Sequence, residues 1–447
     1  MKYITFLFFL FLFYVHSIVA QENPFLKMAG KKYADYSQDF IDEAIAITNR
    51  NDTVEFRKFV SQIREVAEKT GSIEWKMQAE YCELSLIKLY MLQGKVKYSD
   101  EEMLQMMSDL LKKVQKEGVV HLELKLRYDI IEGYWFVIKN YELALEQCEI
   151  QNKRLQTVSS DDIPEIAGLY LQIANIYYTF ADYSKAISYL KKIVSEKETT
   201  ANQWDKQHAR NTMGLCYRYG FNDFDRSDSC FRAILQVKKY FNPYHASGRE
   251  LWEGIAEGNI GRNKVLRGEY DAAIPLLKSS LTKVLKFGDY GYLSHPATNL
   301  AIVYIAKGNL TEAKRYIDSA RHYYDKAQIK ETNLYLIYEA MSKYYAAAGN
   351  TKLCIAYMDS TLAAKDRKAE QFNAMQLTRV EQRKHLSEQK LQEAKLREEE
   401  IKSTGYLRSL AITMVGLFLL GSGFIRYIRL YRKKKSAYQE LVRKLQE

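Results

Sequence analysis

Residues 174–190 read ANIYYTFADYSKAISYL, and the same pattern recurs three times later in the chain. The copies are GRNKVLRGEYDAAIPLL (261–277), AIVYIAKGNLTEAKRYI (301–317) and, more weakly, SKYYAAAGNTKLCIAYM (342–358). Each copy begins with a small residue and has a second small residue twelve positions later. Because two helices approach closely only where a side chain is small, this spacing predicts a helical hairpin with one contact residue on each helix.

Two further stretches keep this pattern in part. Gly214 and Ser227 fit with one inserted residue, and Ala144 keeps the second place in 132–148, where Glu132 occupies the first. In each copy a large residue lies three positions before the second small residue and another lies four positions after it, a spacing that predicts one core-facing helix side. The expected packing residues are Ala174, Ala186, Gly214, Ser227, Gly261, Ala273, Ala301, Ala313, Ser342 and Cys354.

The turns of the hairpins carry their own signal. Gly268, Gly308 and Gly349 stand where the first helix should end, and glycine accepts the left-handed conformation that closes a helix. With this turn the pattern resembles the tetratricopeptide (TPR) repeat over about residues 122–365, although the unit here is about 40 residues rather than about 34. The helical patterns in 21–121 suggest two degenerate hairpins. The expected fold is an all-α, TPR-like solenoid of about eight hairpins with a concave groove.

The resemblance implies that the first helix of each repeat lines this groove. The Lys and Asn pair with which some TPR domains clamp a carboxylate is incomplete, because Leu171 and Asn175 occupy those places. The groove would bind a protein or peptide, while the alternative is that these polar residues are simply solvated. The candidate groove residues are Asn175, Tyr178, His208, Asn211, Arg218, Asn259 and Arg262.

The segment 366–404 has dense charge and neither proline nor glycine, which predicts a long helix with a break near Gly405. Leu377, Val380, Leu391, Ala394 and Ile401 fit a heptad seam, whereas Lys384, Ser387 and Glu398 interrupt it. Two alternatives remain open at this point. The helix forms a weak coiled-coil homodimer, or it is a single solvated helix.

The next segment, 407–425, is the expected transmembrane helix. Its part from Ser409 to Ile425 carries no charge and would span about 26 Å as a helix. Six cations follow between Arg426 and Lys435, and positive flanks stay in the cytoplasm. The basic tail 426–447 is therefore expected to be cytoplasmic.

The N-terminus agrees with this topology. Lys2, the apolar run 3–15 and the small residues up to Ala20 predict a secretory signal peptide over 1–20, with an uncleaved anchor as the alternative. The protein would then be a single-pass protein of the bacterial inner (cytoplasmic) membrane, with its body exported to the periplasm.

Charge and chemistry exclude several classes of function. Of the formal charge of +11, the segment 426–447 carries +6 (eight Lys/Arg against two Glu) and Lys2 carries +1, which leaves +4 for the body. This charge is too diffuse for nucleic-acid binding. The five cysteines are widely spaced, so small buried residues are favoured over a Cys216–Cys230 bridge. No catalytic motif and no metal or cofactor spacing is present, which predicts a protein that is not an enzyme.

The order of signal, TPR array, long helix, span and basic helix resembles bacterial membrane-anchored signalling proteins whose exported TPR sensor joins a cytoplasmic histidine kinase or helix-turn-helix domain. The resemblance favours a non-enzymatic sensor or adaptor that binds a protein or peptide outside and relays to a cytoplasmic partner. The alternatives are an envelope scaffold without signalling, and a truncated regulator or kinase that lacks its output domain.

Overall fold

The computed structural model describes residues 23–49, 53–196, 202–237, 246–288, 290–327 and 334–446, and every regular element in these ranges is a helix. The expected signal peptide, 1–20, lies outside the described residues. The chain consists of two compact units, Met1–Arg379 and Val380–Glu447.

The helices follow one another with short connections. Up to the middle of the array they are η1 (Pro24–Lys27), α2 (Tyr33–Asn49), α3 (Thr53–Thr70), α4 (Ile73–Leu92), α5 (Asp100–Glu117), α6 (Val120–Glu132), the π-helical turn η2 (Gly133–Ile138), α7 (Tyr141–Leu155), α8 (Ile166–Thr179) and α9 (Tyr183–Ser195). The later ones are α10 (Gln203–Phe221), α11 (Phe224–Leu235), α12 (Ala246–Leu266), α13 (Tyr270–Phe287), η4 (Tyr290–Tyr292), α14 (Ser294–Ala306), α15 (Leu310–Lys326), α16 (Leu334–Ala347) and α17 (Thr351–Gln446).

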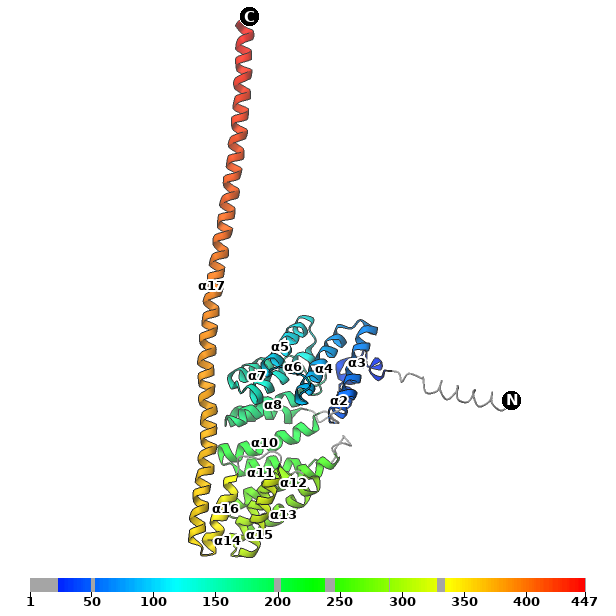
Figure 1. The fold of residues 1–447 in the computed structure, drawn as a ribbon, viewed down its shortest axis with the longest axis vertical. Helices are drawn as coiled ribbons and strands as arrows, with labels where there is room; N and C mark the ends of the chain where they lie inside the picture. The colour runs from blue at the N-terminus through cyan, green and yellow to red at the C-terminus, as the bar shows by residue number, and fades with distance from the viewer. Residues whose placement is uncertain are drawn as a thin grey trace, which may run out of the picture. The chain divides into compact units, whose positions relative to one another are not determined.

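Among the described residues, the helices from α2 to α17 form eight consecutive pairs, α2/α3 to α16/α17. Figure 1 shows the pairs of the first unit stacked in chain order, from blue α3 and α4 to yellow-green α15. Each pair packs on the next, for example α9 on α10, α11 on α12 and α13 on α14. The predicted all-helical solenoid is therefore confirmed.

One backbone device ends the first helix in each of the last six pairs. The residue two positions before the second helix has positive φ, and in the later turns it is Gly268, Gly308 or Gly349, with φ between 72° and 78°. This confirms the predicted role of these glycines. In the three earlier turns the same conformation is imposed on Lys139, Ala181 and Asn222. A side chain there costs on the order of 1 kcal/mol, because its Cβ crowds the backbone.

A second device starts the second helix of the pair. An Asn or Asp side chain just before the helix accepts a hydrogen bond from the backbone N–H three residues later, which satisfies one of the free donors of the first turn. The pair α12/α13 is the exception, because Glu269 makes no such bond. The capping residues are Asn140, Asp182, Asp223, Asn309 and Asn350.

The small residues are placed where the two helices of a pair touch. A Cβ added to Gly214 would lie 2.6 Å from Phe231, and one added to Gly261 would lie 2.8 Å from Leu277. The small residue of the first helix thus faces the large residue four positions after the second small residue. The alanines of the pattern are fully buried: Ala174, Ala186, Ala273, Ala301 and Ala313.

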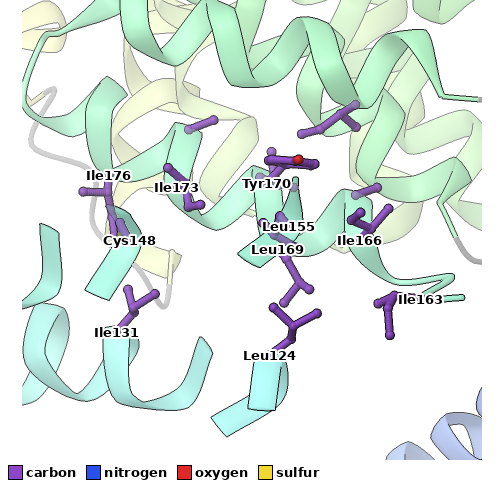
Figure 2. Close-up of a cluster of buried hydrophobic side chains, with 14 of the residues drawn as sticks. Leu124, Ile131, Cys148, Leu155, Ile163, Ile166, Leu169, Tyr170, Ile173 and Ile176 are labelled. Carbon is purple, nitrogen blue, oxygen red and sulfur yellow. The ribbon is translucent and has the colours of Figure 1, made fainter. Parts of the chain in front are cut away.

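The core is a series of apolar layers between the pairs. Figure 2 shows one layer, in which Leu124 and Ile131 of α6 lie beneath Leu169, Ile173 and Ile176 of α8, with side chains of α7 between them. All five cysteines are free, and only Cys354 is not fully buried. The expectation that they are small buried residues is thus confirmed for four of them, and no Cys216–Cys230 bridge forms.

The first pairs meet around buried polar side chains. The ring of Tyr33 on α2 stacks on His121 of α6 at 3.9 Å, and the Lys125 ammonium lies 5.0 Å from the Tyr33 ring centroid. The Tyr33 hydroxyl donates to Glu165. Glu74 Oε1 lies 3.8 Å from His121 Nε2, but burial and then the Lys125 charge dominate and lower the pKa of His121 to about 3. Helix α2 is therefore fixed to α6 and to the start of α8.

Helix α17 departs from the sequence predictions in two ways. It begins at Thr351, as the second helix of the last pair, and continues to Gln446 without a break at Gly405. Gly405 has φ in the ordinary helical range and nothing within 4 Å of an added Cβ, so nothing there interrupts the helix. Met358, predicted to face the core, is 52% exposed, whereas its counterparts Leu277 and Ile317 are buried. The reason is that the described residues contain no further pair to cover this last one.

Candidate functional site

Side chains from consecutive first helices gather around Arg262 of α12. Its Nη1 donates a 2.5 Å hydrogen bond to Asn299 Oδ1 on α14. Arg262 also lies within electrostatic reach of Arg218 on α10 and of Tyr335 and Glu339 on α16. Side chains of α10, α12, α14 and α16 therefore come together at Arg262.

This surface is partly open to solvent. Tyr219 of α10 is 52% exposed, and Arg262 is half-buried. Arginine and tyrosine are the residues that most often anchor protein partners, because each combines a large apolar area with hydrogen-bond donors. We call this set the Arg262 surface; its residues are Tyr219, Arg262, Tyr335 and Glu339, and the buried Asn299 beneath them holds the Arg262 guanidinium.

Beneath it lies a buried polar network centred on Arg218. The Arg218 side chain is 3% exposed and donates to Asn263 Oδ1 at 2.7 Å, to Asn259 Oδ1 at 3.0 Å and to the Asn259 carbonyl at 2.7 Å. These acceptors are all uncharged. Burial accordingly lowers the pKa of the Arg218 guanidinium, whose charge is held by amide and carbonyl dipoles.

The network extends across three helices. Asn259 Nδ2 donates to Asn211 Oδ1 at 3.0 Å, and Asn263 Nδ2 donates to Ser227 Oγ at 3.0 Å and to Asp228 Oδ1 at 2.6 Å. It therefore ties α10, α11 and α12 together. We call it the Arg218 network; its residues are Asn211, Arg218, Ser227, Asp228, Asn259, Asn263 and Arg267.

The structure separates the sequence-predicted groove residues into groups. Asn211, Arg218 and Asn259 belong to the Arg218 network, and Arg262 belongs to the Arg262 surface. Tyr178 lies within electrostatic reach of Arg218, and its ring centroid lies 5.8 Å from that of Tyr183.

The remaining two candidates lie on neighbouring first helices. Asn175 is a half-buried residue of α8. The ring of His208 on α10 lies 5.8 Å from Trp252 of α12, and burial lowers the pKa of this histidine. His208 is therefore part of the contact between two pairs.

Sequence reasoning missed Asn263, Asp228, Tyr219 and Tyr335. Asn259 and Asn263 stand four residues apart on one helix side, so a repeated asparagine at helical spacing was an available signal for the network. Tyr335 carried no such signal. It meets Arg262 only because α16 folds against α14, whose Asn299 holds the guanidinium.

Reactive chemistry has little support in this site. In the described ranges no group of three or more His, Cys, Asp and Glu side chains is placed to hold a metal ion. Burial raises the pKa of Cys148 and Cys216 to about 12 in each case, which keeps these thiols protonated and unreactive. What the arrangement offers is hydrogen bonding and aromatic contact.

The second unit has a different surface. Helix α17 contains a stretch apolar enough to cross a membrane, with a mean hydropathy of 1.7, and none of that stretch is buried. Phe418 is 77% exposed and Leu420 73% exposed, and the cations Arg426 to Lys435 follow on the same helix. By length and composition, one helix of this chain could therefore span a bilayer.

Comparison with known proteins supports the fold. No family model and no curated protein matches the chain. Among solved structures it is similar to the apo form of RapI, with a TM-score of 0.51, 16% identity, and coverage of 75% of this chain and 98% of RapI.

Two further structures show weaker similarity. A tetratricopeptide repeat protein from Parabacteroides merdae ATCC 43184 has a TM-score of 0.44, 14% identity, and coverage of 67% of this chain and 99% of that one. A Rap protein complexed with Competence and Sporulation Factor has a TM-score of 0.43, 14% identity, and coverage of 79% and 99%. The chain's own series of helix pairs, together with the similarity to RapI, shows a TPR-like helical repeat fold.

Proposed function

We propose that this protein is a non-enzymatic, membrane-anchored adaptor or sensor whose Arg262 surface binds a protein or peptide outside the cytoplasm. The observation that carries the proposal is the gathering of Arg262, Tyr219 and Tyr335 from three first helices on one partly open surface. TPR-like solenoids use such surfaces to bind extended partners, because the stacked first helices present side chains in a row. The neighbouring Arg218 network holds α10 and α12 at a fixed spacing, so the surface is formed before the partner arrives.

The membrane part of the proposal is supported by the exposed apolar stretch of α17 and the cations that follow it. An apolar helix surface of this size is unfavourable in water and favourable in a bilayer. The positive flank orients the tail to the cytoplasm and the solenoid to the other side. Binding of a partner to the solenoid would then be signalled to a cytoplasmic protein that binds the basic tail.

Photo-crosslinking tests the binding surface. A benzophenone side chain at Tyr219 should form a discrete adduct in cells, and Arg262→Ala should reduce that adduct by at least about fivefold. The same group at Lys314, on the second helix of another pair, is the control. Equal adducts from both positions, or no effect of Arg262→Ala, would show that partners do not bind at this surface.

Protease accessibility tests the topology separately. In spheroplasts, added protease should digest the solenoid and spare an epitope placed after Lys435. A protected solenoid with a digested epitope would refute the orientation and leave the binding surface untouched.

A further inference from the structure

Helix α17 contacts the solenoid in two separate zones. In the first it pairs with α16, where Ser342 Oγ donates to the Cys354 carbonyl at 3.1 Å and Lys365 Nζ lies 3.8 Å from Glu339 Oε2. Residues 366–374 then lie exposed, a span of about 13 Å of helix, and within it Lys368 Nζ still lies 5.4 Å from the ring centroid of Tyr335 on α16. The second zone begins at Met375, which packs against the core of the earlier pairs.

Arg379 makes the polar contacts of this second zone. Its Nε donates to Glu142 Oε2 on α7 at 3.2 Å, and its guanidinium carbon lies 4.7 Å from the ring centroid of Phe180, at the end of α8. Phe180 is held by Trp135 and Tyr141, whose ring centroids lie 5.1 Å and 6.2 Å away. The arginine therefore docks on a cluster of packed aromatic rings.

Unlike the contacts between successive helix pairs, this contact joins residues that lie far apart along the solenoid. Arg379 and Glu142 are 237 residues apart, and four pairs, α8/α9 to α14/α15, lie between the pairs that carry them. In a solenoid each pair contacts its neighbours, so small changes at every interface add up to a change in curvature. Helix α17 contacts both α16 and the region of α7 and α8, so its second contact depends on the curvature summed over the pairs between them.

We propose that the Met375 and Arg379 contact is a releasable latch, closed at one curvature of the solenoid and open at another. Its polar part is a single ion pair whose side chains are 24% and 16% exposed, with one cation–π contact. Such contacts are individually weak. The latch can therefore open while the α16/α17 pair stays folded. The proposal goes beyond the binding function and stands whether or not a partner binds at Arg262.

Distance measurement by double electron–electron resonance tests the latch in the full chain. Spin labels are attached through Ser184→Cys on α9 and Glu370→Cys on α17, both exposed positions, in a Cys354→Ala background. The unaltered latch should give one narrow distance distribution. Arg379→Glu should convert at least about four-fifths of it to a broad, longer distribution, because the ion pair becomes a repulsion.

Two variants and one stability measurement complete the design. Adding Glu142→Arg to Arg379→Glu should restore most of the narrow distribution by reversing the pair. Arg367→Glu makes the same charge change in the exposed span and should leave the distribution narrow. Urea midpoints from tryptophan fluorescence should stay equal in all variants.

Three results would overturn the proposal. One is an unchanged distance distribution in Arg379→Glu, and another is failure of the reversed pair to restore it. The third is a lowered urea midpoint in step with the broadening, because the contact would then be an ordinary part of the fold.

Discussion

Replacement of Arg218 by alanine should destabilise the solenoid strongly, even though arginine is usually a surface residue. The change removes hydrogen bonds to two Asn259 oxygens and to Asn263 Oδ1 from a site that is 3% exposed. Each buried acceptor left without a donor costs about 1–3 kcal/mol, and the loss of packing adds to this. We expect the free energy of unfolding to fall by about 3–5 kcal/mol.

Arg262→Ala is the matched comparison, because it removes the neighbouring arginine on a half-buried surface. Arg262 makes one described hydrogen bond, to Asn299, so its loss should cost about 1 kcal/mol. Urea unfolding followed by tryptophan fluorescence measures both, since Trp204 and Trp252 lie 5.3 Å apart on α10 and α12, the helices that the network joins. Equal effects of the two changes, or a loss below about 1 kcal/mol for Arg218→Ala, would refute the view that Arg218 is a buried structural residue.

Three further predictions follow from the repeat and its polar contacts. Ala313→Leu overfills a fully buried contact between two helices and should lower the free energy of unfolding by about 1–3 kcal/mol. The adjacent surface change Lys314→Ala should lower it by at most about 0.5 kcal/mol. Similar urea midpoints for the two variants would contradict the packing role of Ala313. Asn309→Ala removes the hydrogen bond to the Glu312 N–H and should cost about 1 kcal/mol in the same assay, while an unchanged midpoint would show that the cap contributes nothing. Burial and then the Lys125 charge lower the pKa of His121 from 6.5 to about 3, so the unfolded chain binds more protons than the folded chain between these pH values. The free energy of unfolding should therefore fall as the pH drops from about 6.5 to 3. His121→Gln should reduce that fall, and an identical pH dependence in the variant would exclude His121 as its source.

The sequence alone determined the class of the fold and the length of its unit. A small residue on each helix, a glycine or another left-handed residue in the turn and an apolar helix side are local requirements, and each leaves its mark within about 20 residues of chain. The Asn or Asp caps such as Asn309 are equally local, and they were readable at the residue after each left-handed position. The apolar stretch of α17 was predicted for the same reason, since length and hydropathy suffice to identify it.

Only the tertiary structure decided which polar residues are buried and which are open. Arg218 and Arg262 are both arginines on first helices, yet one is enclosed by Asn259 and Asn263 and the other is half-exposed. The difference arises from how α10 and α12 approach each other, which no local pattern encodes. The Arg379 contact with Glu142 is the extreme case, because it depends on the summed curvature of all the pairs between them. Local spacing therefore fixes the repeat, and the packing of repeats on one another fixes its surfaces.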